Sequence, residues 1–473
     1  MMNALVLLLS ASWHLATPSS HIMSQTVPPA PASSEGSLPA FVPGPSGSLV
    51  LVEENHALPI VTVVVAAAGG AASDPERLEG LSNLAAEGAR RGAGTRDRTQ
   101  LDDALDDLGA SLDALVDTES TRFVGRVLSK NLEPFLDLLA DVVLRPQFAK
   151  GEFERTKREL VAQIAESHND DRSLCARNFA KRLFGRHPYG QPAEGGEASV
   201  ARISRTRAQR HFREQFSGSN LIFGAAGAVT PEAFASALAA RFGKLPVGRS
   251  LGSGMPRTWP PQGWRLQLVD KPDRQQVQLM FGHLGLPPTH PDYVPLLIGL
   301  TAFGGQAMNA TLMNEVRTQR GWAYGAYMNA IPYRDSGMIR GWVFTGVDHA
   351  VDTLKLVLRL YDELVKTPLK DETIGFFKTF LAGSYASDLD GPDARLWRRI
   401  AAERQGLPRD WVDGFSARVE STSPEDVRRA LSTHVHPHDL AITLVATEAK
   451  LMPLLEAAGV ARNAVDVTPY TAF

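Results

Sequence analysis

The first half of the chain alternates apolar strand-like runs with segments whose apolar residues follow helical spacing. Residues 49–53 and 59–68 are predicted to form two strands of a hairpin, and the β-branched run Val61–Val65 is typical of a central strand. Glycines and prolines mark the ends of the segments with helical spacing. The other expected strands are residues 111–117, 121–128 and 220–228, and the expected helices are residues 75–91, 99–108, 131–144, 150–166, 172–184, 200–216 and 231–242.

The same order of elements begins again in the second half. Strands are expected at residues 264–269, 275–282, 322–329, 336–345 and 440–445, and helices at residues 293–301, 310–320, 350–366, 371–389, 424–431 and 448–457. Shared order, more than residue identity, indicates an internal duplication into halves of roughly two hundred residues. We therefore expect an α+β fold of two duplicated αβ sandwich halves, each a mostly antiparallel sheet with helices packed on one face.

Composition suggests the boundaries of the two halves. Residues 24–48 are rich in Pro, Ala, Ser and Gly, which predicts a flexible lead-in, with folding beginning near Leu49. A second stretch rich in Gly, Pro, Arg and Ser predicts an interdomain linker. The expected division is 1–48 as possible signal segment and lead-in, 49–245 as N-terminal half, 246–262 as linker and 263–473 as C-terminal half.

The N-terminus carries a short apolar run at residues 4–9 with small residues after it, which resembles a secretory signal. No Lys or Arg precedes the run, and Met23 offers an alternative start. A periplasmic or exported location is therefore the first expectation, and a cytoplasmic location is the alternative. The run is too short to span a membrane, and no later segment qualifies.

Length, charge and cysteine content exclude several classes of protein. A chain of 473 residues exceeds what one hydrophobic core usually serves. A net charge of -3, without a basic run, argues against a nucleic-acid partner. Cys175 is the single cysteine, so an intrachain disulfide and a cysteine-based zinc site are both excluded.

One helix–strand junction holds candidate binding chemistry. A helix is expected to end near Arg320, Gly321 breaks it, and a strand follows, so that Arg317 and Tyr324 flank the break. A guanidinium offers a planar fork of donors and a phenol offers one more, which suits binding to a carbonyl or carboxylate. The alternative is an Arg that caps the helix and a Tyr that packs half-buried on the strand.

The histidines give weaker signals. His434, His436 and His438 would share one face of a strand and could serve a metal there. A proline interrupts them and they precede the strand, so a solvated turn is the favoured interpretation. His168 is interpreted as part of a helix-capping cluster and His187 as part of a turn.

Two halves of this size and order, with an Arg and a Tyr separated by six residues in the second, resemble the M16 zinc peptidases. This is the family of insulinase, pitrilysin and the mitochondrial processing peptidase, and the two-half design is most similar to bacterial members that pair two short chains. The resemblance extends from Leu49 to about Val460. It is carried further by the stretches Gly80-Leu81, His187-Pro188-Tyr189-Gly190, Gly304-Gly305 and Asn314-Glu315-Val316-Arg317.

Catalytic members of this family carry His-x-x-Glu-His on the first helix, where two His bind zinc and the Glu polarises water, and a distal Glu completes the site. By position the motif falls on Asn83, Ala86 and Glu87, and the distal ligand falls at or near Gln163. All four positions have departed from the motif, and only Glu87 could bind a metal well. The resemblance thus implies no metal in this chain and no peptidase activity by the chain alone.

What the resemblance implies is a non-catalytic subunit of a heteromeric zinc metallopeptidase. The zinc would belong to a homologous partner that carries His-x-x-Glu-His. Arg317 and Tyr324 would act in trans on the substrate peptide and its transition state. Family members often have Ser-Arg-Leu before this helix, where this chain has Ala310-Thr311-Leu312. The alternatives are an M16-like scaffold or assembly protein with no role in proteolysis, and an independent peptide-binding protein.

Overall fold

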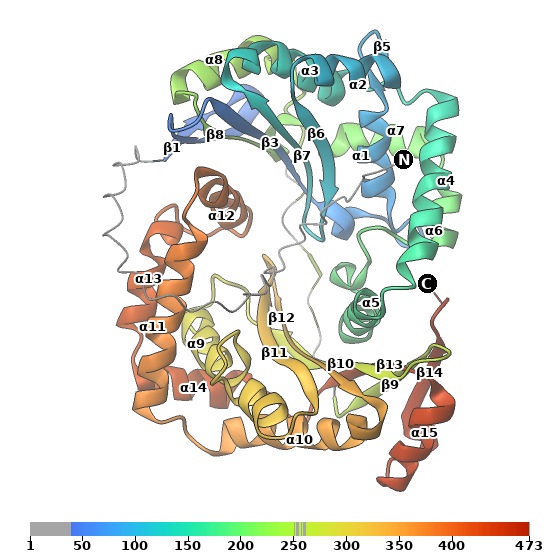
Figure 1. The fold of residues 1–473 in the computed structure, drawn as a ribbon. Coiled ribbons are helices and arrows are strands. Elements are labelled where there is room, and N and C mark those ends of the chain that lie inside the picture. Colours follow the sequence, from blue (N-terminus) through green and yellow to red (C-terminus); the bar gives the residue numbers. More distant parts are fainter. Residues whose placement is uncertain (1–38, 250, 252–254, 257, 259–261, 473) are drawn as a thin grey trace, which may run out of the picture.

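The computed structural model describes residues 39–249, 251, 255–256, 258 and 262–472. Two six-stranded sheets form two layers that face each other, and most helices cover their outer sides (Figure 1). The signal-like run at residues 4–9 lies outside the described residues. Within the described part of the chain, no helix has the length and apolar character to cross a membrane.

The N-terminal sheet has the strand order β1-β2-β8-β3-β7-β6, in which only the β2–β8 pair is parallel. The expected hairpin of residues 49–53 and 59–68 is therefore wrong, because β8 lies between its two strands. The connection between them must cross about 10 Å, twice the strand spacing, which a few extended residues can do. The strands are β1 (Ala40–Pro43), β2 (Leu49–Glu54), β3 (Ile60–Ala68), β6 (Ser111–Val116), β7 (Ser120–Leu128) and β8 (Leu221–Gly227), and a small separate pair is β4 (Gly92–Ala93) and β5 (Arg96–Asp97).

The helices of this half correct two predicted boundaries. The helix expected from residue 75 begins at Leu81, and the helix expected over 200–216 is divided in two where Ser204 caps the second part. The Ser204 hydroxyl accepts a hydrogen bond from the backbone of Arg207, as N-cap serines do. The helices are α1 (Leu81–Arg90), α2 (Arg98–Asp107), α3 (Leu132–Leu144), α4 (Lys150–Ser167), α5 (Asp171–Phe184), α6 (Glu197–Arg202), α7 (Arg205–Gln215) and α8 (Pro231–Phe242).

The C-terminal sheet has the strand order β14-β9-β13-β10-β12-β11, and its part β9-β13-β10-β12-β11 repeats the order β2-β8-β3-β7-β6 of the first sheet. The duplication predicted from the sequence is therefore present as two α+β halves with a repeated topology. Its strands are β9 (Arg265–Asp270), β10 (Gln276–Gly285), β11 (Ala323–Pro332), β12 (Gly337–Gly346), β13 (Ala441–Ala446) and β14 (Val465–Pro469). Its helices are α9 (Tyr293–Gly304), α10 (Val347–Lys366), α11 (Asp371–Asp388), α12 (Pro392–Arg404), α13 (Trp411–Ser421), α14 (Pro424–His434) and α15 (Glu448–Ala457), with a π-helical segment at Met313–Thr318.

Sequence patterns missed six of these elements, among them the short strands β4 and β5. Strand β1 occupies residues within the stretch expected to be a flexible lead-in, and it pairs antiparallel with β2. Strand β14 extends the second sheet in parallel beside β9. Helices α12 and α13 fill the stretch between residues 389 and 424, for which no element was predicted.

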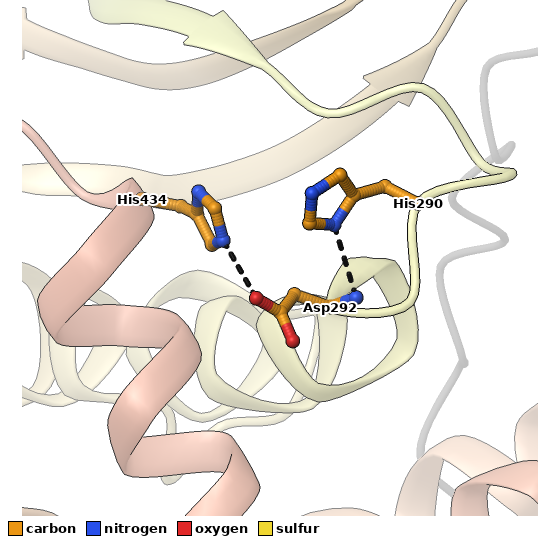
Figure 2. Close-up of side chains that lie close together, drawn as sticks. All are labelled: His290, Asp292 and His434. Carbon is orange, nitrogen blue, oxygen red and sulfur yellow. Dashed lines mark hydrogen bonds and ion pairs between the residues drawn. The ribbon is translucent and has the colours of Figure 1, made fainter.

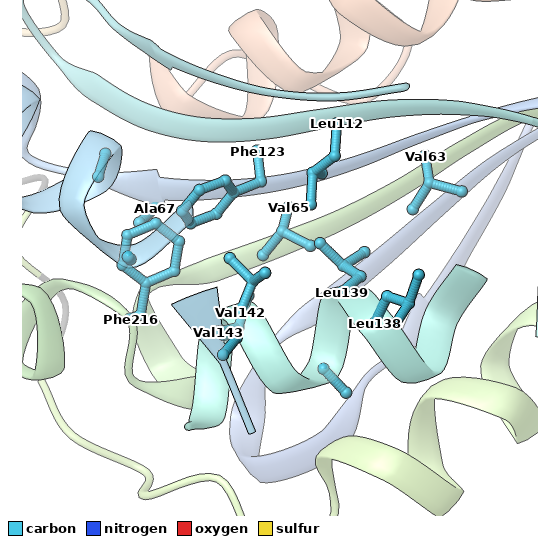
Figure 3. Packing of buried hydrophobic residues seen from close by; sticks show 14 of the residues in the cluster. Val63, Val65, Ala67, Leu112, Phe123, Leu138, Leu139, Val142, Val143 and Phe216 are labelled. Carbon is cyan, nitrogen blue, oxygen red and sulfur yellow. The ribbon is translucent and has the colours of Figure 1, made fainter. Parts of the chain in front are cut away.

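Each half has its own hydrophobic core between its sheet and its outer helices. In the N-terminal core, Val63 and Val65 of β3 pack toward Leu139 and Val142 of α3, together with Phe123 of β7 (Figure 3). The equivalent C-terminal core contains residues of β10 and α10. Two separate cores agree with the length of the chain, since one core rarely serves so many residues.

The inner face of each sheet is covered by a helix from the other half. On the N-terminal sheet, Val64 and Ala66 of β3 pack with Leu396 and Ile400 of α12. Gly224 of β8 allows this approach, because an added Cβ would lie 3.0 Å from side-chain atoms of both α12 residues. Strand β3 is therefore buried on both faces, which explains its continuous apolar run.

The second sheet receives its cover from the first half. Leu174, Cys175 and Phe179 of α5 pack with Met280 of β10 and Val445 of β13. Figure 1 shows α5 and α12 between the two sheets. Burial raises the pKa of the Cys175 thiol far above its usual range, so this side chain acts as a small apolar group.

A buried ion-pair network also joins the halves. Glu53 of β2, only 3% exposed, accepts hydrogen bonds from Arg395 at 3.1 Å and from Arg399 of α12. Arg399 is equally buried and forms a second, two-point pair with Asp413 of α13 at 2.8 and 3.0 Å. These contacts compensate the charges that α12 brings into the space between the sheets.

We predict that Glu53→Ala destabilises the chain by about 3 kcal/mol, because it removes one member of a buried charge network and leaves Arg399 partly unpaired. Urea unfolding of the native and variant chains measures this. Asp410→Ala, which removes the exposed carboxylate paired with Arg418, is the control and should leave the unfolding midpoint unchanged. Equal effects of the two substitutions would contradict the role of the buried network.

Candidate functional site

The junction before β11 differs from the predicted α-helix of residues 310–320. Residues Met313–Thr318 form a π-helical segment, and the backbone N–H of Gln319 donates to the carbonyl of Asn314 at 2.9 Å. Gly321 follows with a φ of 66°, a left-handed conformation that favours glycine. Short π-helical segments are uncommon and occur frequently at functional sites.

A β-bulge lies directly after this segment. The register of β11 against β12 shifts between Ala323 and Ala326, so Tyr324 and its neighbour Gly325 lie in the irregular stretch. Strand β11 is also an edge strand, because β12 is its single neighbour in the sheet. Bulges at sheet edges redirect side chains, which is the physical basis for the position of Tyr324 here.

Tyr324 is 80% exposed, and Arg317 is exposed as well. Nη1 of Arg317 lies 3.9 Å from the sulfur of Met308, to which it donates a weak hydrogen bond. Within the described residues, no hydrogen bond joins Arg317 to Tyr324. The alternative of a half-buried, packed tyrosine is wrong, and both side chains are available to a molecule that approaches this edge.

Sequence reasoning missed Met308 as a member of this site. Its side chain is 57% exposed, and it lies in the loop between α9 and the π-helical segment. Together with Tyr324 it gives the edge an apolar surface beside a cation. An exposed methionine in a glycine-rich loop is a weak signal, since single exposed apolar residues are common.

Helix α1 carries three of the four positions that match the family's zinc motif. Asn83 and Glu87 are four residues apart and share its partly exposed face, whereas Ala86 is fully buried in the core. Arg91 lies 3.8 Å from Glu87 and 3.2 Å from Glu159 of α4, measured between charged atoms. Burial is the largest influence on Glu87 and raises the pKa of its carboxyl despite the nearby Arg91.

These positions do not fit a zinc ion. Gln163 lies exposed on α4, and Ala86 offers no donor atom. Zinc sites need three or four nitrogen, sulfur or carboxylate ligands, and Glu87 supplies one. The Arg91 guanidinium already provides the positive charge beside that carboxylate.

Asp74, Ser82 and His211 lie together at the start of α1. The Ser82 hydroxyl is 2.6 Å from the Asp74 carboxylate and 2.8 Å from His211 Nε2. The same carboxylate accepts hydrogen bonds from the backbone of Gly80 and Ser82. All three side chains are buried, and Asp74 binds the serine instead of the far nitrogen of the histidine, so the cluster caps a helix and is not a nucleophilic triad.

Histidines singled out in the sequence lie in different surroundings in the structure. His187 accepts a hydrogen bond from the backbone of Tyr189 within its turn, as expected. His168 is buried, and Asp170 caps α5. His436 and His438 are exposed after the end of α14, as the expected solvated turn requires, whereas His434 is the last residue of α14 and its Nε2 lies 2.8 Å from the carboxylate of Asp292.

The comparisons with known proteins agree with this architecture. Residues 49–196 match the family model described as "Insulinase (Peptidase family M16)", and residues 202–375 match the one described as "Peptidase M16 inactive domain". The chain belongs to peptidase family M16. The second match begins in α6 and ends in α11, so it crosses the stretch between the two sheets.

Relatives within the M16 family carry different descriptions. The chain is 25% identical over 398 residues to "Uncharacterized zinc protease Rv2782c" of Mycobacterium tuberculosis, covering 83% of this chain and 89% of that protein. It is 20% identical over 402 residues to "Non-peptidase homolog YmxG" of Helicobacter pylori, covering 85% and 92%. The crystal structure of a "peptidase M16 inactive domain" from Pseudomonas fluorescens has a TM-score of 0.80 at 23% identity, covering 86% of this chain and 97% of that one.

These comparisons show the family and the fold. The descriptions "inactive domain" and "non-peptidase homolog" are consistent with a non-catalytic M16 member. At such identities the structural likeness shows the fold alone, so the roles of single residues depend on the geometry described above.

We predict opposite effects of pH for two carboxylates between α1 and α4. The raised pKa means that folding favours the protonated form of the Glu87 carboxyl. The stability that this carboxyl provides is therefore complete below its pKa in the unfolded chain, about 4.3, and is lost as the pH rises through its pKa in the folded chain. Glu87→Gln should therefore stabilise the chain at pH 7, with the difference disappearing near pH 4. Urea unfolding across this range measures it.

Glu159 is the matched control on α4. The hydrogen bond from Arg155 lowers the pKa of the Glu159 carboxyl, so its contribution is present above the unfolded pKa and is lost as pH falls through the folded pKa. Glu159→Gln should accordingly destabilise the chain at pH 7. The same sign of effect for both substitutions would contradict this assignment.

Proposed function

We propose that this chain is a non-catalytic subunit of a heteromeric M16 zinc metallopeptidase. In this proposal it completes the active-site chamber of a homologous subunit that carries His-x-x-Glu-His, and it offers Arg317 and Tyr324 to the substrate peptide. The zinc chemistry belongs to the partner, because the corresponding positions of this chain hold Asn83, Ala86, Glu87 and Gln163. The short apolar run at residues 4–9 supports a periplasmic or exported location for the assembly, with a cytoplasmic location as the alternative.

The observation that carries the proposal is the exposure of Tyr324 at the edge of the sheet. A large aromatic side chain that is 80% exposed contributes little to the stability of the fold by burial. It lies at a β-bulge on a sheet edge, and the exposed Arg317, seven residues earlier, contacts the half-exposed Met308. Such a combination of a phenol donor, a cation and apolar surface suits a peptide bound across the edge of the sheet.

The chemistry of each side chain follows from its donors. The Tyr324 hydroxyl can donate a hydrogen bond to a peptide carbonyl oxygen as that oxygen gains negative charge, which lowers the barrier to cleavage. Arg317 presents several N–H donors, so it can hold a neighbouring carbonyl of the same peptide. Neither residue transfers a proton or attacks the peptide, and therefore both can act from a second chain.

The first prediction concerns activity of the chain alone. Purified chain should show no chelator-sensitive cleavage of peptides, because α1 lacks the ligands for zinc and the group that activates water. Mixing it with a family member that carries His-x-x-Glu-His should produce cleavage that phenanthroline abolishes. Chelator-sensitive turnover by the isolated chain, purified to constant specific activity, would refute the proposal.

The second prediction concerns the assembled pair. Arg317→Ala and Tyr324→Phe should each reduce kcat/KM by roughly a hundredfold, or about 3 kcal/mol in the barrier, as losing one donor to a developing oxyanion typically does. Assembly, measured by size-exclusion chromatography with light scattering, should remain unchanged.

Two neighbouring side chains serve as matched controls for this experiment. Arg320→Ala removes a cation that pairs with Glu315, and Tyr327→Phe removes a hydroxyl from a ring stacked on Trp342. Both should leave turnover within a few-fold of the native pair. Unaltered turnover in Arg317→Ala and Tyr324→Phe would instead favour a scaffold without a role in proteolysis.

A further inference from the structure

Residues from two distant parts of the sequence meet in the C-terminal half. His290 lies in the turn before α9, Asp292 is the residue directly before that helix, and His434 is the last residue of α14. One potential ligand atom from each residue lies within 4.8 Å of the other two. Figure 2 shows both imidazole rings turned toward Asp292 from opposite sides.

The contacts orient these groups toward one another. Nδ1 of His290 accepts a hydrogen bond from the backbone N–H of Asp292 at 3.1 Å, so binding of a metal by this nitrogen requires that hydrogen bond to open. Nε2 of His434 lies 2.8 Å from one Asp292 carboxylate oxygen. The two imidazole centroids are 5.2 Å apart, and the rings are nearly perpendicular, with an interplanar angle of 80°.

The Asp292 carboxylate is fixed by a third side chain. Arg429 donates to its other oxygen at 2.7 Å and is itself paired with Asp426 at 2.9 Å. The result is a nearly buried carboxylate with one oxygen at Arg429 and the other at His434.

We propose that His290, Asp292 and His434 form a site for a divalent transition-metal ion, with Zn²⁺ as the best match. Two imidazoles and one carboxylate are a ligand set that zinc favours, whereas Mg²⁺ and Ca²⁺ prefer oxygen ligands alone. Three protein ligands leave the fourth position for water. The site is separate from the zinc-motif positions on α1, and the proposal does not depend on the role of the chain in proteolysis.

Binding requires small movements of these side chains. Ligand atoms of a tetrahedral zinc site lie about 3.3 Å apart, given metal–ligand distances near 2.0 Å. The closer contact of His434 with Asp292 therefore opens slightly, and the ion takes the place of the proton on Nε2, which moves to Nδ1 or to solvent. Arg429 keeps its hold on the other carboxylate oxygen throughout, as outer partners of metal ligands do.

A cavity reaches one member of the cluster, His434. It has a volume of about 240 Å³, and its walls include His434, His436, Asp439 and Thr258. His283 also lines it but is not available as a ligand, because its nitrogens contact the carbonyl of Leu284 and the hydroxyl of Tyr361, each at 2.7 Å. An entry path is one of the conditions that a metal site must meet.

The test uses the full chain without a histidine tag, freed of metal by chelation and dialysis. Zn²⁺ titration by calorimetry should give one ion per chain, and Zn²⁺ should raise Tm because the ion binds the folded state. Mg²⁺ should do neither. Co²⁺ should bind with a visible absorption band that reports nitrogen and oxygen ligands.

The variants are chosen to keep the fold. His290→Asn retains an acceptor for the backbone of Asp292, and His434→Gln retains a donor for its carboxylate. Each should weaken Zn²⁺ binding by more than about tenfold and remove the rise in Tm. His438→Ala, which alters a histidine that is 74% exposed four residues beyond the cluster, is the control and should bind Zn²⁺ as the native chain does.

Two results would overturn the proposal. One is the absence of stoichiometric Zn²⁺ binding to the native chain. The other is equal binding by the native chain, His290→Asn and His434→Gln, which would place the ion elsewhere. Because all measurements use the chain alone and none measures cleavage, failure here leaves the peptidase-subunit proposal unaffected.

Discussion

The mutual covering of two sheets by helices α5 and α12 is the constraint on which the rest of the structure depends. A sheet with apolar residues on both faces cannot leave one face in water without a large loss of hydrophobic free energy. Here the outer face of each sheet is covered by helices of its own half, and the inner face by one helix of the other half. The two halves therefore hold a fixed relation, and the edge that presents Tyr324 has a defined position in the whole chain.

This arrangement also explains which parts of the fold the sequence revealed. The run Val61–Val65 was recognisable as a central strand because β-branched residues repeat without interruption. Its neighbours were not recognisable, because β8 arrives from more than 150 residues further along the chain to lie between β2 and β3. Local patterns describe a strand and its burial, whereas the order of strands depends on contacts that no local window contains.

The same distinction applies to the candidate site. The spacing of Arg317 and Tyr324 was visible in the sequence, but their exposure was not, since it depends on a π-helical segment and a bulge. A helix with five-residue hydrogen bonds has nearly the same apolar pattern over a few residues as one with four-residue bonds. Similarly, His434 was noted among its neighbours in sequence, and its true neighbours, His290 and Asp292, lie more than 140 residues earlier.

Gly224 and the two exchanged helices have a consequence for the history of the chain. A duplication begins with copies that can each fold alone, and either copy can then be lost. Once each copy has given a covering helix to the other, and a glycine has made room for it, separation would leave two apolar sheet faces bare. From that point the two halves can only be retained together. Residues such as those of the zinc motif can still change, whereas the duplicated fold cannot.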